Sequence, residues 1–255
     1  MKLYIHYTVW NKAAHVPWLC EGIKYLPKDT VIDFVFDNCT DNSLQNFVHH
    51  GINGTLKEFK DIRYFESTKK LRAPNTNDAI ERFMASECDF FLTPQDDQKV
   101  QDKHIHRNLA RLYAQEPNVG LVGMRDGIIH NTHIEYFSCS HSHAVKENVT
   151  WLEGGQYKEV DFVNDGPLCF SKATVEKVGL LDIEYWAHYI DNDYCKRCND
   201  HGLRNFVMGA EIIHEKWGCR VCGPIIGSEV WTQEYSSHDW EVYQRKCGSW
   251  KHLPF

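Results

Sequence analysis

Two adjacent carboxylates, Asp96 and Asp97, follow a short apolar run at residues 90–92. An apolar run of this length that is bounded by a proline is typical of a buried strand, and parallel sheets bind ligands at the carboxyl ends of their strands. Two carboxylates repel each other there unless a cation lies between them. A divalent cation with oxygen ligands would relieve the repulsion and would also bind phosphate. The alternative is a solvated acidic turn.

Two further side chains could join such a site. Asp191 opens a predicted helix, where the macrodipole keeps a carboxylate ionised. The alternative is that Asp191, or equally Asp193, only caps that helix. His214 follows a predicted strand, where a histidine either binds a metal or makes structural hydrogen bonds.

The elements that must position these side chains alternate between strand and helix in the first half of the chain. That alternation predicts a doubly wound, mostly parallel α/β sheet with helices on both faces. We predict Asn77 as a helix N-cap and Gly51 as the residue beyond a short helix. Residues 125–160 are polar and lack clear periodicity. Strands are predicted at residues 3–9, 31–36, 62–65, 90–92, 118–124, 160–163, 168–170, 204–208 and 211–214, and helices at residues 17–25, 47–50, 77–87, 105–113, 172–178 and 189–201.

The composition restricts the class of protein. The 255 residues are 42% hydrophobic and 25% charged, which is enough for one large α/β domain or two small ones, and no break in composition calls for two. A net charge of -7 disfavours a nucleic-acid partner. The N-terminus is too short and polar for a signal peptide, and no window approaches the roughly 18 apolar residues of a membrane span. We therefore expect a cytoplasmic protein without a transmembrane segment, whose cysteines are mostly reduced.

Several segments, in this order along the chain, resemble the motifs of inverting family-2 glycosyltransferases with the GT-A fold. The order is more specific than any single motif. In the first half of the chain, residues 37–43 resemble the donor loop and residues 96–97 resemble the Asp-x-Asp metal motif. In the second half, residues 164–166 resemble the acceptor-side turn and residues 178–182 resemble the Gly-x-x-Asp segment. Residues 189–197 then resemble the Glu-Asp-x-Asp-x-x-x-Arg helix, and residues 204–214 resemble the closing strands.

The resemblance implies a single Rossmann-like domain that binds a nucleoside-diphosphate sugar with Mn²⁺ or Mg²⁺. It implies transfer of the sugar, with inversion, to a hydroxyl of a glycan or glycoconjugate. The implied roles are donor binding at Asp37, Asn38, Asp41, Gln95 and Asp96, metal binding at Asp97 and His214, and catalytic base at Asp191.

The chain departs from the family pattern in three places. The second acidic position of the donor loop, which the resemblance would assign to the ribose contact, is shifted. Gln95 stands where the first aspartate of the metal motif is expected, and its neutral oxygen adds no charge to a metal site. Ile190 replaces the glutamate before the base, which removes a group that would help to position the base. From the residues themselves, Asn75 and Asn77 precede a predicted helix whose N-terminus could bind phosphate, with simple capping as the alternative.

The cysteines suggest a second metal. Cys195 and Cys198 form one Cys-x-x-Cys pair, and Cys219 and Cys222 form another, which is the spacing of a structural zinc site. The alternative is that the first pair lies in a helix as part of the core.

The leading hypothesis is therefore a metal-dependent inverting glycosyltransferase. We expect a domain over residues 1–227, with a donor half at about 1–124 and an acceptor half at about 125–227, and an aromatic-rich extension, 228–255, packed on it. Two alternatives remain. One is a metal-dependent phosphohydrolase or nucleotidyltransferase, although no P-loop motif is present. The other is a non-catalytic module that binds nucleotide sugars, which Gln95 and Ile190 would suit.

Overall fold

The fold is seen in a computed structural model of the chain. It describes residues 1–69, 71–124, 128–131, 135–137, 149–163, 166–186, 188–214, 228–248 and 250, with only the backbone of 128–131, 135–137, 149–151, 214 and 228–236.

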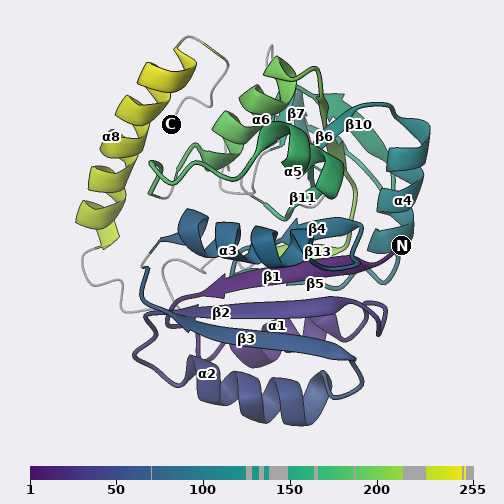
Figure 1. The fold of residues 1–255 in the computed structure, drawn as a ribbon, viewed down its shortest axis with the longest axis vertical. Helices are drawn as coiled ribbons and strands as arrows, with labels where there is room; N and C mark the ends of the chain where they lie inside the picture. Colours follow the sequence, from purple (N-terminus) through teal and green to yellow (C-terminus); the bar gives the residue numbers. More distant parts are fainter. Residues whose placement is uncertain are drawn as a thin grey trace.

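An eight-stranded mixed sheet forms the centre of the protein (Figure 1). The strand order is β10-β12-β6-β11-β4-β1-β2-β3. β11 is antiparallel to both β4 and β6, and β10 is antiparallel to β12, while the other six strands share one direction. The bounds are β1 (Leu3–Val9), β2 (Val31–Asp37), β3 (Asp61–Ser67), β4 (Phe90–Thr93), β6 (Val119–Gly123), β10 (Tyr157–Val160), β11 (Leu168–Ser171) and β12 (Arg204–Met208).

Helices cover both faces of this sheet, and each face has its own apolar cluster (Figure 1). One cluster contains residues of α3, α5, α6 and α8, and the other contains residues of α1, α4 and the π-helix η1. The helices are α1 (Val16–Ile23), α2 (Ser43–Asn46), η1 (Phe47–Thr55), α3 (Arg72–Met84), α4 (Ile105–Gln115), α5 (Lys172–Val178), α6 (Ile190–Asp200) and α8 (Ser228–Cys247).

The buried strands follow the period of two that a pleated sheet imposes. In β2, Phe34 and Phe36 lie in the cluster of α1, so the alternate residues Asp33, Val35 and Asp37 face the side of α3. The end of β2 therefore presents an aspartate on the α3 face.

Two small sheets complete the fold. β5 (Gln98–Val100) pairs antiparallel with β13 (Ile212–His214), and β7 (Ile128–Asn131) pairs with both β8 (Glu135–Phe137) and β9 (Val149–Trp151). In the part of the chain that the structure describes, no helix is long and apolar enough to cross a bilayer.

The predicted fold class is confirmed, and most elements of the main sheet lie where the sequence predicts them. Two helix predictions are wrong. α3 begins at Arg72, so Asn77 is not its N-cap; Pro74 is tolerated in the first turn, where backbone N–H groups lack helical partners anyway. The helix does not end before Gly51, which lies inside η1 and is packed against α1, where a Cβ would lie 3.1 Å from the Cys20 sulfur.

Predictions in the middle of the chain also need correction. The strand predicted at residues 160–163 is instead β10, which ends at Val160. Strands β7, β8 and β9 lie in a region where no strand was predicted, and β5 was missed as well. Each of these three-to-four-residue strands is too short for a periodic pattern to show, and each exists only through pairing with a partner.

A buried charge network joins the sheet to α3. Asp33, which is fully buried in β2, accepts hydrogen bonds from Arg82 Nε at 2.8 Å and Nη2 at 3.1 Å, and from the Tyr4 hydroxyl. His6 Nδ1 lies 3.4 Å from the same carboxylate. Burial alone would raise the pKa of Asp33, but His6 and Arg82 outweigh it and lower the pKa to about 2.

This network predicts an acid-sensitive part of the stability. The folded pKa lies below the ordinary value of 3.8, so the contribution is present above pH 4 and is lost as the pH falls toward 2. We expect Asp33→Asn to cost about 2 kcal/mol of unfolding free energy at pH 7 and to flatten the acid limb. Urea unfolding between pH 2 and pH 7 measures this, with the exposed Asp29→Asn as control. An unchanged acid limb in Asp33→Asn would contradict it.

Candidate functional site

The loops that follow three neighbouring strands, β4, β1 and β2, meet at the carboxyl edge of the parallel strands. The backbone N–H of Trp10, just after β1, donates to Asp96 Oδ2 at 3.2 Å, and Lys12 Nζ lies 3.8 Å from Asp96 Oδ1. The Cys39 thiol, just after β2, donates to the carbonyl of Val9 at 3.3 Å. This edge is therefore one connected surface that carries most of the predicted site residues.

The loop after β2 has a fixed shape. Asp37 is 4% exposed and lies opposite Ser67 in the register of β2 and β3. Asn38 has a positive φ of 50°, which asparagine tolerates better than most residues, and its N–H donates to the Ser67 carbonyl at 2.6 Å. The turn leaves Asp37 on the α3 face at the end of its strand.

Asp41 holds this loop to the neighbouring one. Its carboxylate accepts the N–H of Ala13 at 2.9 Å and the N–H of Ser43 at 3.0 Å. The Ser43 hydroxyl donates to the same carboxylate at 2.5 Å. These bonds form an Asx turn within the loop, and they use Asp41 to shape the site.

The turn after β4 is closed by two glutamines. The N–H of Gln95 donates to Gln98 Oε1 at 2.9 Å, and Gln98 Nε2 lies 3.3 Å from Gln95 Oε1. Gln98 is fully buried. The Gln95 side chain, at the position of the motif's first aspartate, is thus used to close the turn that carries Asp96 and Asp97.

The charge of Asp96 is finely balanced. Burial and, to a lesser extent, the neighbouring Asp97 raise the pKa of its carboxyl. The Lys12 ammonium lowers that pKa, and Arg72 lowers it weakly. The resulting pKa is about 6, above the ordinary value. Sequence reasoning missed Lys12. Its position directly after β1, at the same edge as Asp96, is the signal that could have identified it.

A strand pair brings His214 to this edge. β13 runs antiparallel to β5, and the register places His214 opposite Gln98, the residue after Asp97. The backbone of His214 therefore lies beside the acidic turn although the two segments are far apart in the sequence. This pairing depends on β5, which the sequence did not predict.

Asp191 reaches the same edge because of the direction of α6. Near the end of β6, Val163 packs against Gly123 and its N–H donates to Cys195 Sγ at 3.4 Å. Near the start of β6, a Cβ on Gly120 would lie 3.0 Å from the Cβ of Cys198. α6 therefore runs opposite to β6, and its first turn, which holds Asp191, lies at the carboxyl edge.

The capping alternative for the first turn of α6 is wrong. The N-cap is Tyr189, so Asp191 and Asp193 both lie inside the helix. Asp193 Oδ2 accepts from Arg197 Nε at 2.8 Å, and burial raises its pKa although Arg197 opposes this. Asp191 is 5% exposed, and its Oδ1 accepts the N–H of Asn192 at 3.0 Å.

The two asparagines of α3 lie in its first two turns. Asn75 Nδ2 donates to the Leu71 carbonyl at 3.0 Å, and Asn75 also lines a groove of about 320 Å³ with Ser67 and Lys69. Asn77 makes two hydrogen bonds to Leu181. Its Nδ2 donates to the Leu181 carbonyl at 2.8 Å, and its Oδ1 accepts the Leu181 N–H at 2.9 Å. Asn75 thus borders open space near Asp37, whereas Asn77 joins α3 to the segment after α5.

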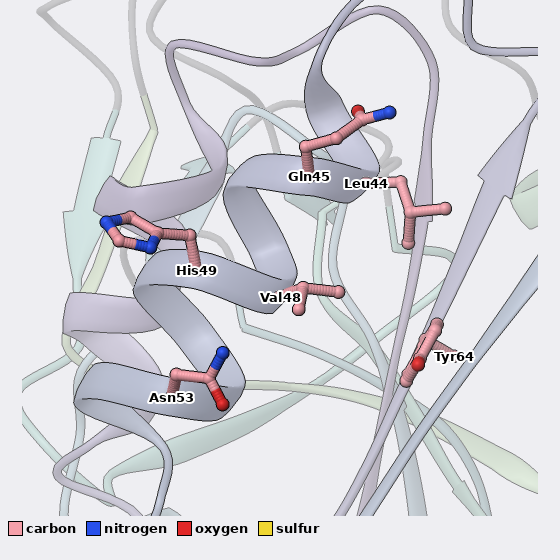
Figure 2. A pocket seen from close by; sticks show the side chains of 6 residues that line it. All are labelled: Leu44, Gln45, Val48, His49, Asn53 and Tyr64. Atoms are coloured by element: carbon pink, nitrogen blue, oxygen red, sulfur yellow. The ribbon is translucent and has the colours of Figure 1, made fainter.

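A second groove lies elsewhere. It has a volume of about 410 Å³ between α2, η1 and β3, with the side chains of Leu44 and Val48 directed toward Tyr64 (Figure 2). Gln45, His49 and Asn53 line it as well. None of the predicted site residues borders it, so we place the chemistry at the carboxyl edge.

The zinc site finds no support in the structure. Cys195 and Cys198 are both fully buried in the core between α6 and β6, and burial raises the pKa of both thiols. Cys219 and Cys222 lie outside the described residues. Among the side chains that the structure describes, no three metal-binding groups converge.

The segment 164–166, which resembles the acceptor-side turn, also lies largely outside the described residues.

Comparison with known proteins identifies the fold. No protein-family model matches the chain, and no curated protein sequence does. Among solved structures, the mannosyltransferase PcManGT from Pyrobaculum calidifontis, in complex with GDP-Man and Mn²⁺, is similar with a TM-score of 0.65 and 13% identity over 99% of this chain and 65% of that one. TarS 1–349 from S. aureus, in complex with UDP-GlcNAc, is similar with a TM-score of 0.57 and 13% identity over 93% of this chain and 66% of that one.

The full TarS structure is similar with a TM-score of 0.60 and 12% identity, over 96% of this chain and 44% of that one. This chain therefore spans two thirds or less of the length of these structures. Their likeness shows that it has the fold of the GT-A-type glycosyltransferases, as the resemblance of its motifs implied.

The bonds of Asn77 predict a structural role for this residue. We expect Asn77→Ala to lower the unfolding free energy by about 2–3 kcal/mol, because it leaves the N–H and carbonyl of Leu181 buried without their partner. Urea unfolding measures the loss, and the exposed Glu81→Ala on the same helix is the control. Nucleotide affinity that falls without a loss of stability would instead indicate a ligand contact.

Proposed function

We propose that this protein is a metal-dependent inverting glycosyltransferase that uses a nucleoside-diphosphate sugar. The observation that supports it most directly is the meeting, at one edge of a GT-A fold, of an acidic turn at Asp96 and Asp97, the backbone of His214 and the first turn of α6. Such an edge is where open α/β sheets bind nucleotides.

Asp191 would act as the base. The acceptor hydroxyl gives its proton to the Asp191 carboxylate, its oxygen bonds to the anomeric carbon, and the bond from that carbon to the diphosphate oxygen breaks, leaving the electron pair on the diphosphate. α6 packs on β6, which is separated from β4 by β11 alone. The base and the acidic turn would therefore lie at the same edge of the sheet, two strands apart in its order.

Asp37 and Asn75 would bind the nucleoside. Both lie on the α3 face, and the groove that Asn75 lines also includes Ser67, the register partner of Asp37. The positive charges of Lys12 and Arg72, which both act on Asp96, would attract the diphosphate. Because the similar structures hold GDP-Man or UDP-GlcNAc, both nucleotides are suitable probes.

The acidic turn would hold Mn²⁺ or Mg²⁺ in this proposal. Asp97 would offer carboxylate oxygens, which suit Mn²⁺ and Mg²⁺, and the motif resemblance adds His214 as a further ligand. Burial raises the pKa of Asp96 most and the neighbouring Asp97 adds to it, and a bound cation would oppose both effects. When bound, the cation would stabilise the charge that develops on the leaving diphosphate.

These roles divide the chain into a part that would bind the donor and a part that would bind the acceptor. Residues 1–124 would form the donor half and residues 125–227 the acceptor half, with the segment from 228 onward attached to the acceptor half. A phosphohydrolase or a non-catalytic nucleotide-sugar-binding module would share the acidic turn but would not need a base on α6. The following variants separate these functions.

Asp191→Asn tests the base. We expect release of nucleoside diphosphate from UDP-GlcNAc or GDP-Man, with a panel of acceptor glycans, to fall by at least about 100-fold because no carboxylate can take the proton. Binding of UDP or GDP, measured by calorimetry, should stay within twofold. Asp200→Asn, on the exposed end of the same helix, is the control. Wild-type turnover in Asp191→Asn would contradict the proposal.

Asp97→Asn tests the metal site. We expect Mn²⁺ to tighten UDP or GDP binding to the wild-type protein and to lose most of that effect in the variant, which has one ligand charge fewer. Asp89→Asn removes an exposed carboxylate at the opposite end of β4 and should leave the effect intact. Nucleotide binding that EDTA and Asp97→Asn both leave unchanged would exclude this metal site.

A further inference from the structure

The segment between α5 and α6 is held by a buried carboxylate of α8. Asp239 is fully buried, its Oδ1 accepts the N–H of Trp186 at 2.8 Å, and its Oδ2 accepts the N–H of His188 at 2.7 Å. A buried carboxylate is stable only with such donors, and the loop in turn gains two bonds from a rigid helix. The residues that receive this support lie directly before the helix of Asp191.

Other groups of α8 contact the same segment. The ring of His238 stacks on Trp186 with centroids 3.5 Å apart. Arg245 Nη2 lies 2.9 Å from Glu184 Oε2, and Lys246 pairs with both Asp182 and Glu184. These exposed ion pairs contribute little each, so the buried carboxylate is the principal contact.

The last residue before α6 adopts an uncommon conformation. Tyr189 has a φ of 59°, in the left-handed region where a bulky residue is strained. Its ring packs on Tyr243 and Trp240 of α8, with centroids 4.9 and 5.7 Å away. Because this backbone angle sets the direction in which α6 starts, α8 stabilises the strained conformation that places Asp191.

We infer that Asp239 is a positioning residue: by holding the backbone of Trp186 and His188, it fixes the start of α6 and presents Asp191 to the acceptor. This inference rests on the proposed function of Asp191 as the base. The carboxylate of Asp239 does not itself touch substrate in this role. Its effect comes through geometry, because a displacement of about 1 Å at a reacting group can cost roughly 100-fold in rate.

Asp239→Asn is the direct test. The asparagine keeps one oxygen acceptor but opposes the second N–H with its own amide donors, so one of the two bonds is lost. We expect kcat for nucleoside diphosphate release to fall 10- to 100-fold, with the dissociation constant for UDP or GDP with Mn²⁺ within twofold of wild type. Amide hydrogen exchange at Trp186 and His188 should become faster at temperatures where the variant is folded.

Two controls separate positioning from stability. Val242→Ala weakens the packing of α8 on the core but keeps the carboxylate, and it should lower Tm without a comparable loss of kcat. Glu241→Gln, an exposed change on the same helix, should alter neither. If the loss of kcat relative to the loss of Tm is the same in Val242→Ala as in Asp239→Asn, the effect of Asp239 is one of stability and the inference is wrong.

A second variant keeps the test decisive if Asp239→Asn fails to fold. Tyr189→Gly makes the positive φ free of strain but removes a buried ring that α8 holds, so we expect Tm to fall and kcat, measured well below that Tm, to fall about 10-fold. Wild-type kcat in both folded variants would overturn the inference while leaving the base intact. Turnover that survives Asp191→Asn would overturn the base itself, and hydrogen exchange would then still report whether Asp239 holds the loop.

Discussion

The packing of α6 against β6 is the constraint on which the site depends. Gly120 allows the helix to approach so closely that a side chain there would meet Cys198, and Cys195 is bonded to the backbone of Val163 one turn earlier. These contacts determine both the height and the direction of the helix. If α6 ran the other way, Asp191 would lie at the opposite edge of the sheet, far from the acidic turn after β4.

Charge at this edge is balanced by segments that meet only in three dimensions. The carboxylate of Asp96 receives a backbone N–H from Trp10 and the nearby ammonium of Lys12, while Asp97 remains beside it as a like charge. The result is an edge of the sheet at which acidic and basic side chains lie close together. A similar balance holds Asp33 between His6 and Arg82, where it joins the sheet to α3.

Two of the departures from the pattern of the resembled family can be related to contacts in the structure. Gln95 exchanges side-chain bonds with Gln98 and so shapes the turn that carries the acidic pair. Ile190 is a buried apolar residue at the start of α6, where a glutamate would be expected. The positioning that the glutamate would provide must then come from another group. Asp239 and the aromatic rings around Tyr189 would provide it from α8.

The sequence by itself determined the α/β class, most strands and helices of the main sheet, and the residue types at the acidic turn and on α6, because these follow from local periodicity and motif order. It could not determine the pairing of β5 with β13, the start of α3, the role of Asn77 in joining α3 to Leu181, or the contacts of Lys12 and Asp239. Those depend on which distant segments are brought into contact. Short strands and buried carboxylates are stable only once such partners are in place, and partners far apart in the chain leave no periodic trace in the sequence.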